Sequence, residues 1–437
     1  MAFYGSNNTL LIGDDGAVFS SFDSDGVSAT TIASTEFAIA SNDPENGAEF
    51  GAAVAVGSGR IVIGAHKNDI SVADQGWVTI HDLNGTLISS KQYGAIFSGS
   101  TTLGGSVASG GGRIAAGSSG IGAYSGLYTW DLDGENRSGL QSSNLFKQTN
   151  VALGSGKLVV GFRLHEDGSG DSEEDGKIQI YDIYDNHAQT AYMFNQTPIT
   201  ILSPDSESTE YFGGEVSVGN GRIFASSFTY EPNFPKRGYL LDTKGSLIKK
   251  IFPSGTQSGH FGGGGYWRPH GSDIGCGKIV VGMDGAYSQT GTNVQIGRAY
   301  VYDLNGNEQF VLGPSDSDTA VGASPPDIGS TAYGYSVAIG SNIIAVGAPS
   351  YDNGTGKVYI YNLNGEEIEQ IQASDSDENS SFGAALAIGN NRLIVGAPYA
   401  DVPASVNAGK VYGYKLDGTI DTYFEDVLDT IGNNKWV

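Results

Sequence analysis

The chain has 437 residues, of which 66 are Gly and 13 are Pro, and its single cysteine, Cys276, cannot form an internal disulfide. Its 48 acidic residues outnumber the 23 basic ones, and the formal net charge of −25 disfavours nucleic acid and anionic lipid as partners. The glycines follow no Gly-X-Y period, which excludes a collagen.

The N-terminal residues give the first structural signals. MAFYGSNNTL lacks the basic segment and apolar core of an export signal, so we expect none, and no apolar run reaches the roughly 18 residues of a membrane span. TLLIGDDGAVFSSF, Thr9–Phe22, has the pattern of two strands around a tight turn. FAIASNDPENGAEFG, Phe37–Gly51, matches QIQASDSDENSSFG, Gln370–Gly383. Residues 1–49 therefore resemble an incomplete copy of a unit that the rest of the chain repeats.

From Phe50 onward, a pair of short apolar runs recurs. In AVAVGSGRIVIGA, Ala53–Ala65, two runs of Val, Ile and Ala flank a Gly-rich turn, which is typical of a hairpin buried on both faces. The first run consists of small residues, as crowding near a central axis requires. The copies begin at Phe50, Leu103, Asn150, Phe212, Gly271, Tyr333 and Phe382.

Each copy is followed by a second segment with the pattern of strand, tight turn and strand. In KVYIYNLNGEEIEQI, from Lys357, apolar and polar residues alternate around Asn-Gly, the strongest short-range signal of a hairpin. Two hairpins make one four-stranded antiparallel sheet, which cannot bury both of its faces alone. These second segments begin at Gly76, Gly126, Gly176, Arg237, Gly297, Gly356 and Gly409.

Seven such units predict an all-β fold, a seven-bladed β-propeller of four-stranded antiparallel blades. One or two N-terminal strands that pair with the last blade would close the ring and remove open sheet edges. We expect residues 1–49 to supply these strands, residues 50–424 the seven repeats, and residues 425–437 a C-terminal tail. The alternatives are eight blades with a half-built first blade, an open β-solenoid, and two β-sandwiches.

The two ends of the first hairpin carry a family resemblance. Phe382-Gly383 is followed by Gly396-Ala397-Pro398, and Tyr333-Gly334 is followed by Gly347-Ala348-Pro349. These motifs resemble the FG-GAP repeat of integrin α-subunit propellers, and the resemblance covers nearly the whole chain. It implies the propeller fold. In that family several repeats also bind calcium in an Asp-rich loop between the two motifs.

The calcium loop of the family has no counterpart in the quoted repeats. Its place is taken by Gly57-Ser58-Gly59, Gly219-Asn220-Gly221, Gly340-Ser341-Asn342 and Gly389-Asn390-Asn391. Calcium takes roughly six to eight oxygen ligands, and these segments are short and carry no carboxylate. We therefore expect plain hairpin turns, no metal at these positions, and no cofactor.

The particular variant of the repeat has a second resemblance. VAVGSGRIVIGA, VYDLNGNE and ASDSD are similar to repeats in structural proteins of tailed phages that infect marine cyanobacteria. The resemblance implies a virion protein, such as a tail fibre, a tail-associated adhesin or a capsid decoration. Such a protein is made in the host cytoplasm without a signal peptide.

The loops that join the two hairpins of a unit are the candidate binding region. In a propeller they emerge on one face together with the linkers between blades, and here they vary in length while the strands hardly vary. Their aromatic side chains suit sugars and protein partners, although a Tyr after Gly-Ala-Pro can also simply cap the sheet. The candidate residues are Tyr124, His165, Tyr230, Phe234, Tyr287, Tyr351 and Tyr399, with His66 among the same loops.

Three other segments have weaker signals. EDGSGDSEEDG, Glu166–Gly176, offers Asp167, Asp171 and Glu173 as weak calcium candidates, against the alternative of a solvated acidic loop. HFGGGGYWRPH, His260–His270, lacks a phosphate-binding pattern and favours a well-packed loop. The SDSD motifs at 315–318 and 374–377 indicate turns and solubility.

These patterns favour a binding protein over an enzyme. The chain has no His-Glu-x-x-His, Gly-x-Ser-x-Gly or Cys-x-x-Cys motif, and its inner strands are almost free of charge. We expect a non-enzymatic virion protein that binds a host-surface glycan or protein, or other virion proteins, without nucleic acid and without membrane insertion. An integrin-like cell-surface adhesin would need an export signal and calcium loops. A propeller lyase or glycosidase would need paired carboxylates at the central channel.

Overall fold

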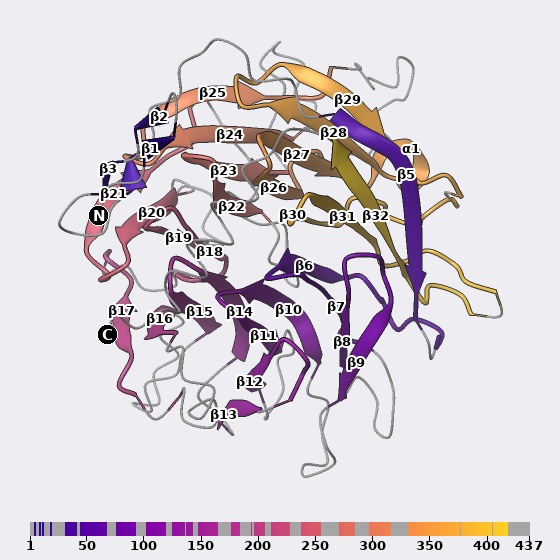
Figure 1. Ribbon diagram of the computed structural model, residues 1–437, viewed down its shortest axis with the longest axis horizontal. Coiled ribbons are helices and arrows are strands. Elements are labelled where there is room, and N and C mark those ends of the chain that lie inside the picture. The colour runs from indigo at the N-terminus through magenta and orange to yellow at the C-terminus, as the bar shows by residue number, and fades with distance from the viewer. Residues whose placement is uncertain are drawn as a thin grey trace.

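The structure is a computed structural model that contains seven four-stranded antiparallel sheets. Figure 1 looks along the axis of the ring and shows one strand of each sheet near the centre. The seven-bladed propeller predicted from the repeats is therefore confirmed. The described residues are 4–5, 8–9, 11–12, 18–19, 31–41, 44–67, 76–92, 102–118, 125–135, 137–142, 147–164, 176–183, 194, 196–205, 211–227, 237–254, 271–284, 297–315, 331–375, 377–403 and 405–417.

The first three blades follow one another along the chain, and each begins at the centre and ends at the rim (Figure 1). Blade 1 consists of β6 (Ala53–Gly57), β7 (Arg60–Ala65), β8 (Trp77–His81) and β9 (Leu87–Gln92). Blade 2 consists of β10 (Leu103–Gly110), β11 (Arg113–Ser118), β12 (Ser125–Asp131) and β13 (Ser138–Ser142). Blade 3 consists of β14 (Lys147–Gly154), β15 (Lys157–Leu164), β16 (Lys177–Asp182) and β17 (Ile199–Leu202).

The remaining blades keep the same order of strands. Blade 4 consists of β18 (Val216–Gly219), β19 (Arg222–Ser227), β20 (Arg237–Asp242) and β21 (Leu247–Ile251). Blade 5 consists of β22 (Ser272–Gly275), β23 (Lys278–Met283), β24 (Arg298–Asp303) and β25 (Glu308–Leu312). Blade 6 consists of β26 (Ser336–Gly340), β27 (Ile343–Ala348), β28 (Lys357–Asn362) and β29 (Glu367–Ile371), with the short α1 (Tyr351–Gly354) between β27 and β28. Blade 7 consists of β30 (Ala385–Gly389), β31 (Arg392–Ala397), β32 (Lys410–Asp417) and β5 (Thr31–Ala40).

The ring is closed by a strand from the N-terminal region. β5 runs antiparallel to β32 and forms the outer strand of blade 7 (Figure 1). Glu36 of β5 accepts hydrogen bonds from the Tyr414 hydroxyl at 2.9 Å and from the Ser374 hydroxyl at 2.6 Å, so it is tied to two other segments of blade 7. The closing strand was predicted, but the last repeat was expected to supply a complete hairpin of its own. The outer edge of β32 is instead paired with β5.

The rest of the N-terminal region forms two small ladders. β1 (Tyr4–Gly5) pairs with β2 (Asn8–Thr9), and β3 (Leu11–Ile12) pairs with β4 (Val18–Phe19). The second ladder lies within the predicted strand–turn–strand segment Thr9–Phe22. The described residues contain no eighth four-stranded sheet, so the eight-bladed alternative is set aside.

The seven inner hairpins all end in two-residue turns. Both turn residues have positive φ, as in Ser58 (φ 48°) and Gly59 (φ 76°), which is the geometry of a type I′ turn. Asn tolerates this conformation, so Asn390 (φ 45°) and Asn391 (φ 60°) form the same turn in blade 7. The plain turn predicted in place of a calcium loop is thus present. The other pairs are Gly111-Gly112, Ser155-Gly156, Asn220-Gly221, Cys276-Gly277 and Ser341-Asn342.

Several of these turns are linked to one another around the axis. The backbone N–H of Gly59 donates to Asn390 Oδ1 at 2.8 Å, which joins blade 1 to blade 7. The Gly277 N–H donates to Asn220 Oδ1 at 3.1 Å in the same way between blades 5 and 4. The first turn residue therefore has a second role, because its side chain fixes the neighbouring turn.

The Phe-Gly motif, Tyr-Gly in blade 6, forms a tight turn at the entrance of the inner strands of blades 1, 6 and 7. In blade 1 the Ala52 N–H donates to the Glu49 carbonyl at 3.0 Å, and Gly51 has φ +88°. A type II turn requires positive φ at its third residue, which explains the Gly. Phe50, the second residue of the turn, is buried and packs in the core between blades 7 and 1.

The Gly of Gly-Ala-Pro contacts this turn in the next blade. A Cβ atom on Gly396 of blade 7 would lie 2.1 Å from the carbonyl oxygen of Gly51 in blade 1. The same approach joins Gly64 to Gly104 at 2.0 Å and Gly347 to Gly383 at 2.1 Å. The two halves of the repeated motif therefore meet across the boundary between blades, and only Gly allows the backbones to approach so closely.

The core lies between neighbouring blades. Phe382 packs edge-on against Tyr412 with ring centroids 5.4 Å apart, and Tyr333 packs against Tyr359 at 5.1 Å. Burying an aromatic side chain of this size stabilises the fold by about 1.5–3 kcal/mol. One cluster contains residues of both blade 6 and blade 7, including Val358 and Phe382, so adjacent blades stabilise one another.

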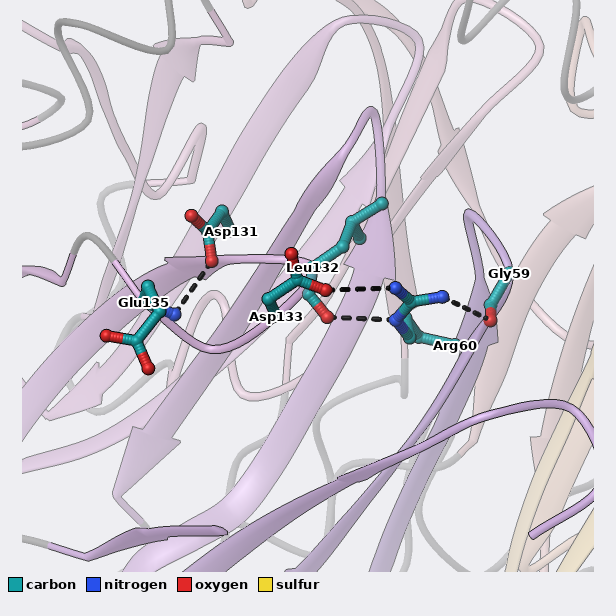
Figure 2. A network of polar contacts seen from close by, with 6 residues as sticks. All are labelled: Gly59, Arg60, Asp131, Leu132, Asp133 and Glu135. Carbon is teal, nitrogen blue, oxygen red and sulfur yellow. Dashed lines mark hydrogen bonds and ion pairs between the residues drawn. The ribbon is translucent and has the colours of Figure 1, made fainter. Parts of the chain in front are cut away.

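Arginines join the inner turns to the outer turns of the next blade. Figure 2 shows Arg60, whose Nε donates to the Leu132 carbonyl at 2.9 Å and whose Nη2 donates to Asp133 at 3.1 Å. In the same outer turn the Glu135 N–H donates to Asp131 Oδ1 at 2.7 Å (Figure 2). The equivalent bonds run from Arg222 to the Leu304 carbonyl and from Arg392 to the Leu83 carbonyl.

Candidate functional site

The loop face is the end of the ring opposite the hairpin turns. Inner and outer turns lie at one end of each antiparallel blade, so the loops within blades and the linkers between blades lie at the other. On this face the structure describes loop 349–356 of blade 6, loop 398–409 of blade 7, and the linkers 372–382 and 44–52 apart from residues 376 and 404. These segments form the candidate site.

Loop 349–356 is fixed by the linker that leads into blade 7. The Asn379 N–H donates to the Asn353 carbonyl at 3.1 Å, and the Ser381 N–H donates to the Gly354 carbonyl at 2.7 Å. Asp352 and Asn353 have positive φ, of 45° and 56°, and both side chains are exposed. Such backbone conformations cost on the order of 1–3 kcal/mol each and persist where surrounding contacts hold them.

Loop 398–409 is fixed in the same way by its neighbours. The Tyr399 N–H donates to the Ser380 carbonyl at 3.2 Å, which links this loop to linker 372–382. The Gly47 N–H donates to the Val406 carbonyl at 3.0 Å, and the Phe50 N–H donates to the Ala408 carbonyl at 2.9 Å. The loop face of blades 6, 7 and 1 is therefore one hydrogen-bonded surface rather than a set of separate loops.

The two predicted tyrosines in this surface are both half-buried. The Lys357 ammonium lies 3.7 Å from the centre of the Tyr351 ring, a distance typical of a cation–π contact. Tyr351 also packs against the core cluster between blades 5 and 6. Tyr351 thus has a structural role, and it still presents part of its surface beside the exposed Asp352 and Asn353.

Of the other predicted site residues, the structure describes His66. His66 is buried, and its Nε2 lies 3.5 Å from Glu49, which also accepts a hydrogen bond from Lys67 at 2.7 Å. Glu49 is itself buried and has φ 55°, directly before the Phe-Gly turn. Tyr124, His165, Tyr230, Phe234, Tyr287, Asp167, Asp171, Glu173 and the segment His260–His270 lie outside the described residues.

The acidic linker motifs have a function that the sequence analysis missed. In blade 7, Asp375 of the second SDSD motif accepts hydrogen bonds from Lys410 at 2.8 Å and from the Tyr412 hydroxyl at 2.7 Å. Burial raises the pKa of Asp375, but these bonds lower it more, and the net shift is downward. The motif therefore anchors the linker to the third strand of the blade, in addition to favouring turns and solubility.

Blade 4 repeats this arrangement with another linker. Asp205 forms an ion pair with Arg237 at 2.9 Å and accepts a hydrogen bond from the Tyr239 hydroxyl at 3.0 Å. Lys250 also pairs with Asp205. The signal in the sequence is a basic residue followed two positions later by Tyr at the start of the third strand.

Two carboxyl groups lie on adjacent inner segments of blades 4 and 5. Burial raises the pKa of Glu215 well above its ordinary value and that of Asp273 to about 6. Asp273 accepts hydrogen bonds from the backbone N–H groups of Ile274 and Ile339, both at 2.8 Å. The expectation of nearly uncharged inner strands therefore misses these two residues, and the bonds made by Asp273 join blade 5 to blade 6.

Within the described ranges, no group of three or more His, Cys, Asp and Glu side chains is arranged to hold a metal ion. The described helices also include none that is long and apolar enough to span a membrane.

One of the comparisons with known proteins, a match to a family model, agrees with the repeats in the sequence. The family model of the FG-GAP repeat matches residues 366–414. No curated protein matches the chain. Among solved structures, the chain is similar to the β-propeller domain of the Trilobed protease from Pyrococcus furiosus, with 12% identity over 87% of this chain and 97% of that one and a TM-score of 0.46.

Proposed function

We propose that this chain is a non-enzymatic structural and adhesion protein of a tailed-phage virion, and that its loop face binds a glycan or protein on the host surface or another virion protein. The observation that supports this role is the loop surface of blades 6, 7 and 1. Its backbone is fixed by hydrogen bonds between adjacent segments, while Asp352 and Asn353 remain exposed. A surface that is ordered before binding loses less conformational entropy when a partner arrives.

The FG-GAP match and the repeats support the adhesion-type fold, and the phage assignment depends on the resemblance of the repeat variant. The described hydrogen bonds favour binding over catalysis. Among the described residues, two buried carboxyl groups lie on inner segments: Glu215 Oε1 accepts a hydrogen bond from the Ser272 hydroxyl of blade 5, and Asp273 accepts a backbone hydrogen bond at each oxygen. Such groups are suited to joining blades.

Purified virions test the proposal directly. Mass spectrometry should find this chain in the particles, and antibody labelling under the electron microscope should place it at tail or fibre tips for host attachment, or across the head for decoration. The recombinant chain should bind intact host cells and compete with infection if it attaches to the host. Absence from purified particles would refute the virion role.

A further inference from the structure

A basic residue and a tyrosine recur at the start of the third strand in blades 4 to 7. They lie two positions apart, so their side chains leave the strand on the same face. The position is next to the loop face, because the basic residue directly follows the loop within the blade. The pairs are Arg237 with Tyr239, Arg298 with Tyr300, Lys357 with Tyr359, and Lys410 with Tyr412.

In blades 4 and 7 a carboxylate from the preceding linker occupies this pair. Asp205 contacts both the Arg237 guanidinium and the Tyr239 hydroxyl, at 2.9 Å and 3.0 Å. Asp375 contacts Lys410 and the Tyr412 hydroxyl at 2.8 Å and 2.7 Å. In these two blades the basic residue and the tyrosine therefore form a binding site for a carboxylate, and the carboxylate comes from the preceding linker of the same chain.

In blade 6 the basic residue has different partners. Lys357 donates to Gln370 at 3.1 Å and lies over the Tyr351 ring. The position is thus occupied there by other groups of the same blade.

Blade 5 differs from the other three. Among the described residues, none forms an ion pair or a hydrogen bond with the Arg298 side chain, and its Nε is buried without an acceptor. The side chain is partly exposed, so a ligand can reach the guanidinium. A buried N–H without an acceptor is unfavourable, which favours a ligand that supplies one.

The two sequence segments that adjoin Arg298 in the chain order of blade 5 offer no carboxylate. Residues 255–270, in the preceding linker, contain no Asp or Glu, although the chain has 48 of them. Residues 285–296, which precede Arg298 in the loop of the same blade, contain none either. Ser254 follows the outer strand β21 by three residues, as Asp205 follows β17, and it has no carboxylate.

We propose that Arg298 is a binding subsite for a carboxylate group of the ligand that the loop face binds. The inference rests on the proposed function, because it names the chemistry that the loop face recognises in blade 5. The guanidinium binds carboxylates through two parallel hydrogen bonds, which gives orientation as well as affinity. A ligand carboxylate takes the place that Asp205 and Asp375 occupy in blades 4 and 7.

Titration with sodium glucuronate, followed by NMR or calorimetry at low salt, tests this subsite, and glucose is the uncharged control. Wild type should bind glucuronate in the millimolar range and glucose at least tenfold more weakly. Arg298→Gln should weaken glucuronate binding at least tenfold without changing the circular dichroism spectrum. Asp205→Ser provides the matched gain of function, because it opens the equivalent position at Arg237 and should add a second site.

Equal binding of glucose and glucuronate, or unchanged binding by Arg298→Gln, would overturn the subsite. Glucuronate that binds at least tenfold more tightly than N-acetylglutamate would identify an acidic sugar as the source of the carboxylate, and the reverse preference would identify an acidic protein side chain. The proposed function has a separate readout. If the wild-type chain binds host cells but does not bind glucuronate, the subsite is refuted and the proposed function stands. If the chain binds glucuronate but neither binds host cells nor occurs in virions, the subsite stands and the proposed function is refuted.

Discussion

Gly396→Ala tests whether the Phe-Gly and Gly-Ala-Pro motifs serve to join blades. The new Cβ would lie 2.1 Å from the Gly51 carbonyl oxygen, more than 1 Å closer than the ordinary contact range of 3.4–4 Å. Both contacting groups belong to the backbone, so relief requires movement of one blade relative to the other. Overpacking of this kind costs about 1–3 kcal/mol and sometimes more.

The backbone conformation itself does not oppose the change. Gly396 does not have positive φ, and Gly→Ala at a compatible position stabilises a protein by about 0.4–1 kcal/mol through the unfolded state. We therefore expect a net loss of about 1–2 kcal/mol in the free energy of unfolding, and more if the two blades cannot move apart. Guanidinium titration with circular dichroism would measure it, and Gly64→Ala, with a contact of 2.0 Å to Gly104, should behave alike.

Gly59→Asn is the matched control. Gly59 has φ +76° and open space around its Cβ position, and Asn342 and Asn391 occupy the equivalent turn position in blades 6 and 7. This variant should change the free energy of unfolding by less than about 0.5 kcal/mol. If Gly396→Ala unfolds at the same guanidinium concentration as wild type and as Gly59→Asn, the close approach of the blades does not explain the motif.

Four further outcomes follow from the described contacts. Burial raises the pKa of Glu215, so this carboxyl group should make the wild-type protein less stable as the pH rises from 4.5 towards the folded pKa. The free energy of unfolding should fall by up to about 1.4 kcal/mol per pH unit in this range. Glu215→Gln should abolish this pH-dependent component in melting curves recorded at different pH values. Asp375→Asn should cost no more than about 1 kcal/mol at pH 7 because the Asp375 side chain is 51% exposed. Burial raises the pKa of Asp375, but its hydrogen bonds lower it overall, so the difference from wild type should shrink as the pH falls below 3.8 and vanish below the folded pKa, as acid titration would show. Replacing Tyr351 and Tyr399 together by Ala should weaken host-cell binding in a pull-down assay without lowering the melting temperature by many degrees. A chelator should shift the melting temperature little, since the inner turns carry no carboxylate, and a large calcium-dependent shift would contradict that assignment.

The blade architecture could be predicted because its determinants are local. Gly-rich turns and small apolar strands recur in the same order in every unit, and each turn needs only two residues that accept positive φ. The outer turns were predicted from Asn-Gly, but their mechanism differs. In blade 1 only Gly85 (φ 86°) is left-handed, the register shifts beside His81, and Asp82 accepts bonds from the N–H groups of Asn84 and Thr86. This geometry is a turn followed by a Gly bulge, and the Asp that starts it stabilises it.

The contacts of the site could not be predicted in the same way. Asp375 reaches Lys410 across a separation of 35 residues, and Asp205 reaches Arg237 only because the linker folds back on blade 4. The sequence shows acidic linkers and basic strand ends separately, but their pairing depends on how far each blade is rotated from the last. The same limit applies to Glu215, whose burial follows from the contact between two inner strands.

The glycines that join the blades also position the binding surface. Gly396 contacts Gly51 directly before loop 398–409 begins and directly after linker 44–50 ends, so these two segments are brought side by side at the boundary between blades. Loop 349–356 and linker 377–382 are joined in the same way through Gly347 and Gly383. Each described part of the loop face therefore consists of a loop from one blade and the linker into the next. A ligand on such a surface contacts two blades at once, so its binding energy also opposes separation of the blades.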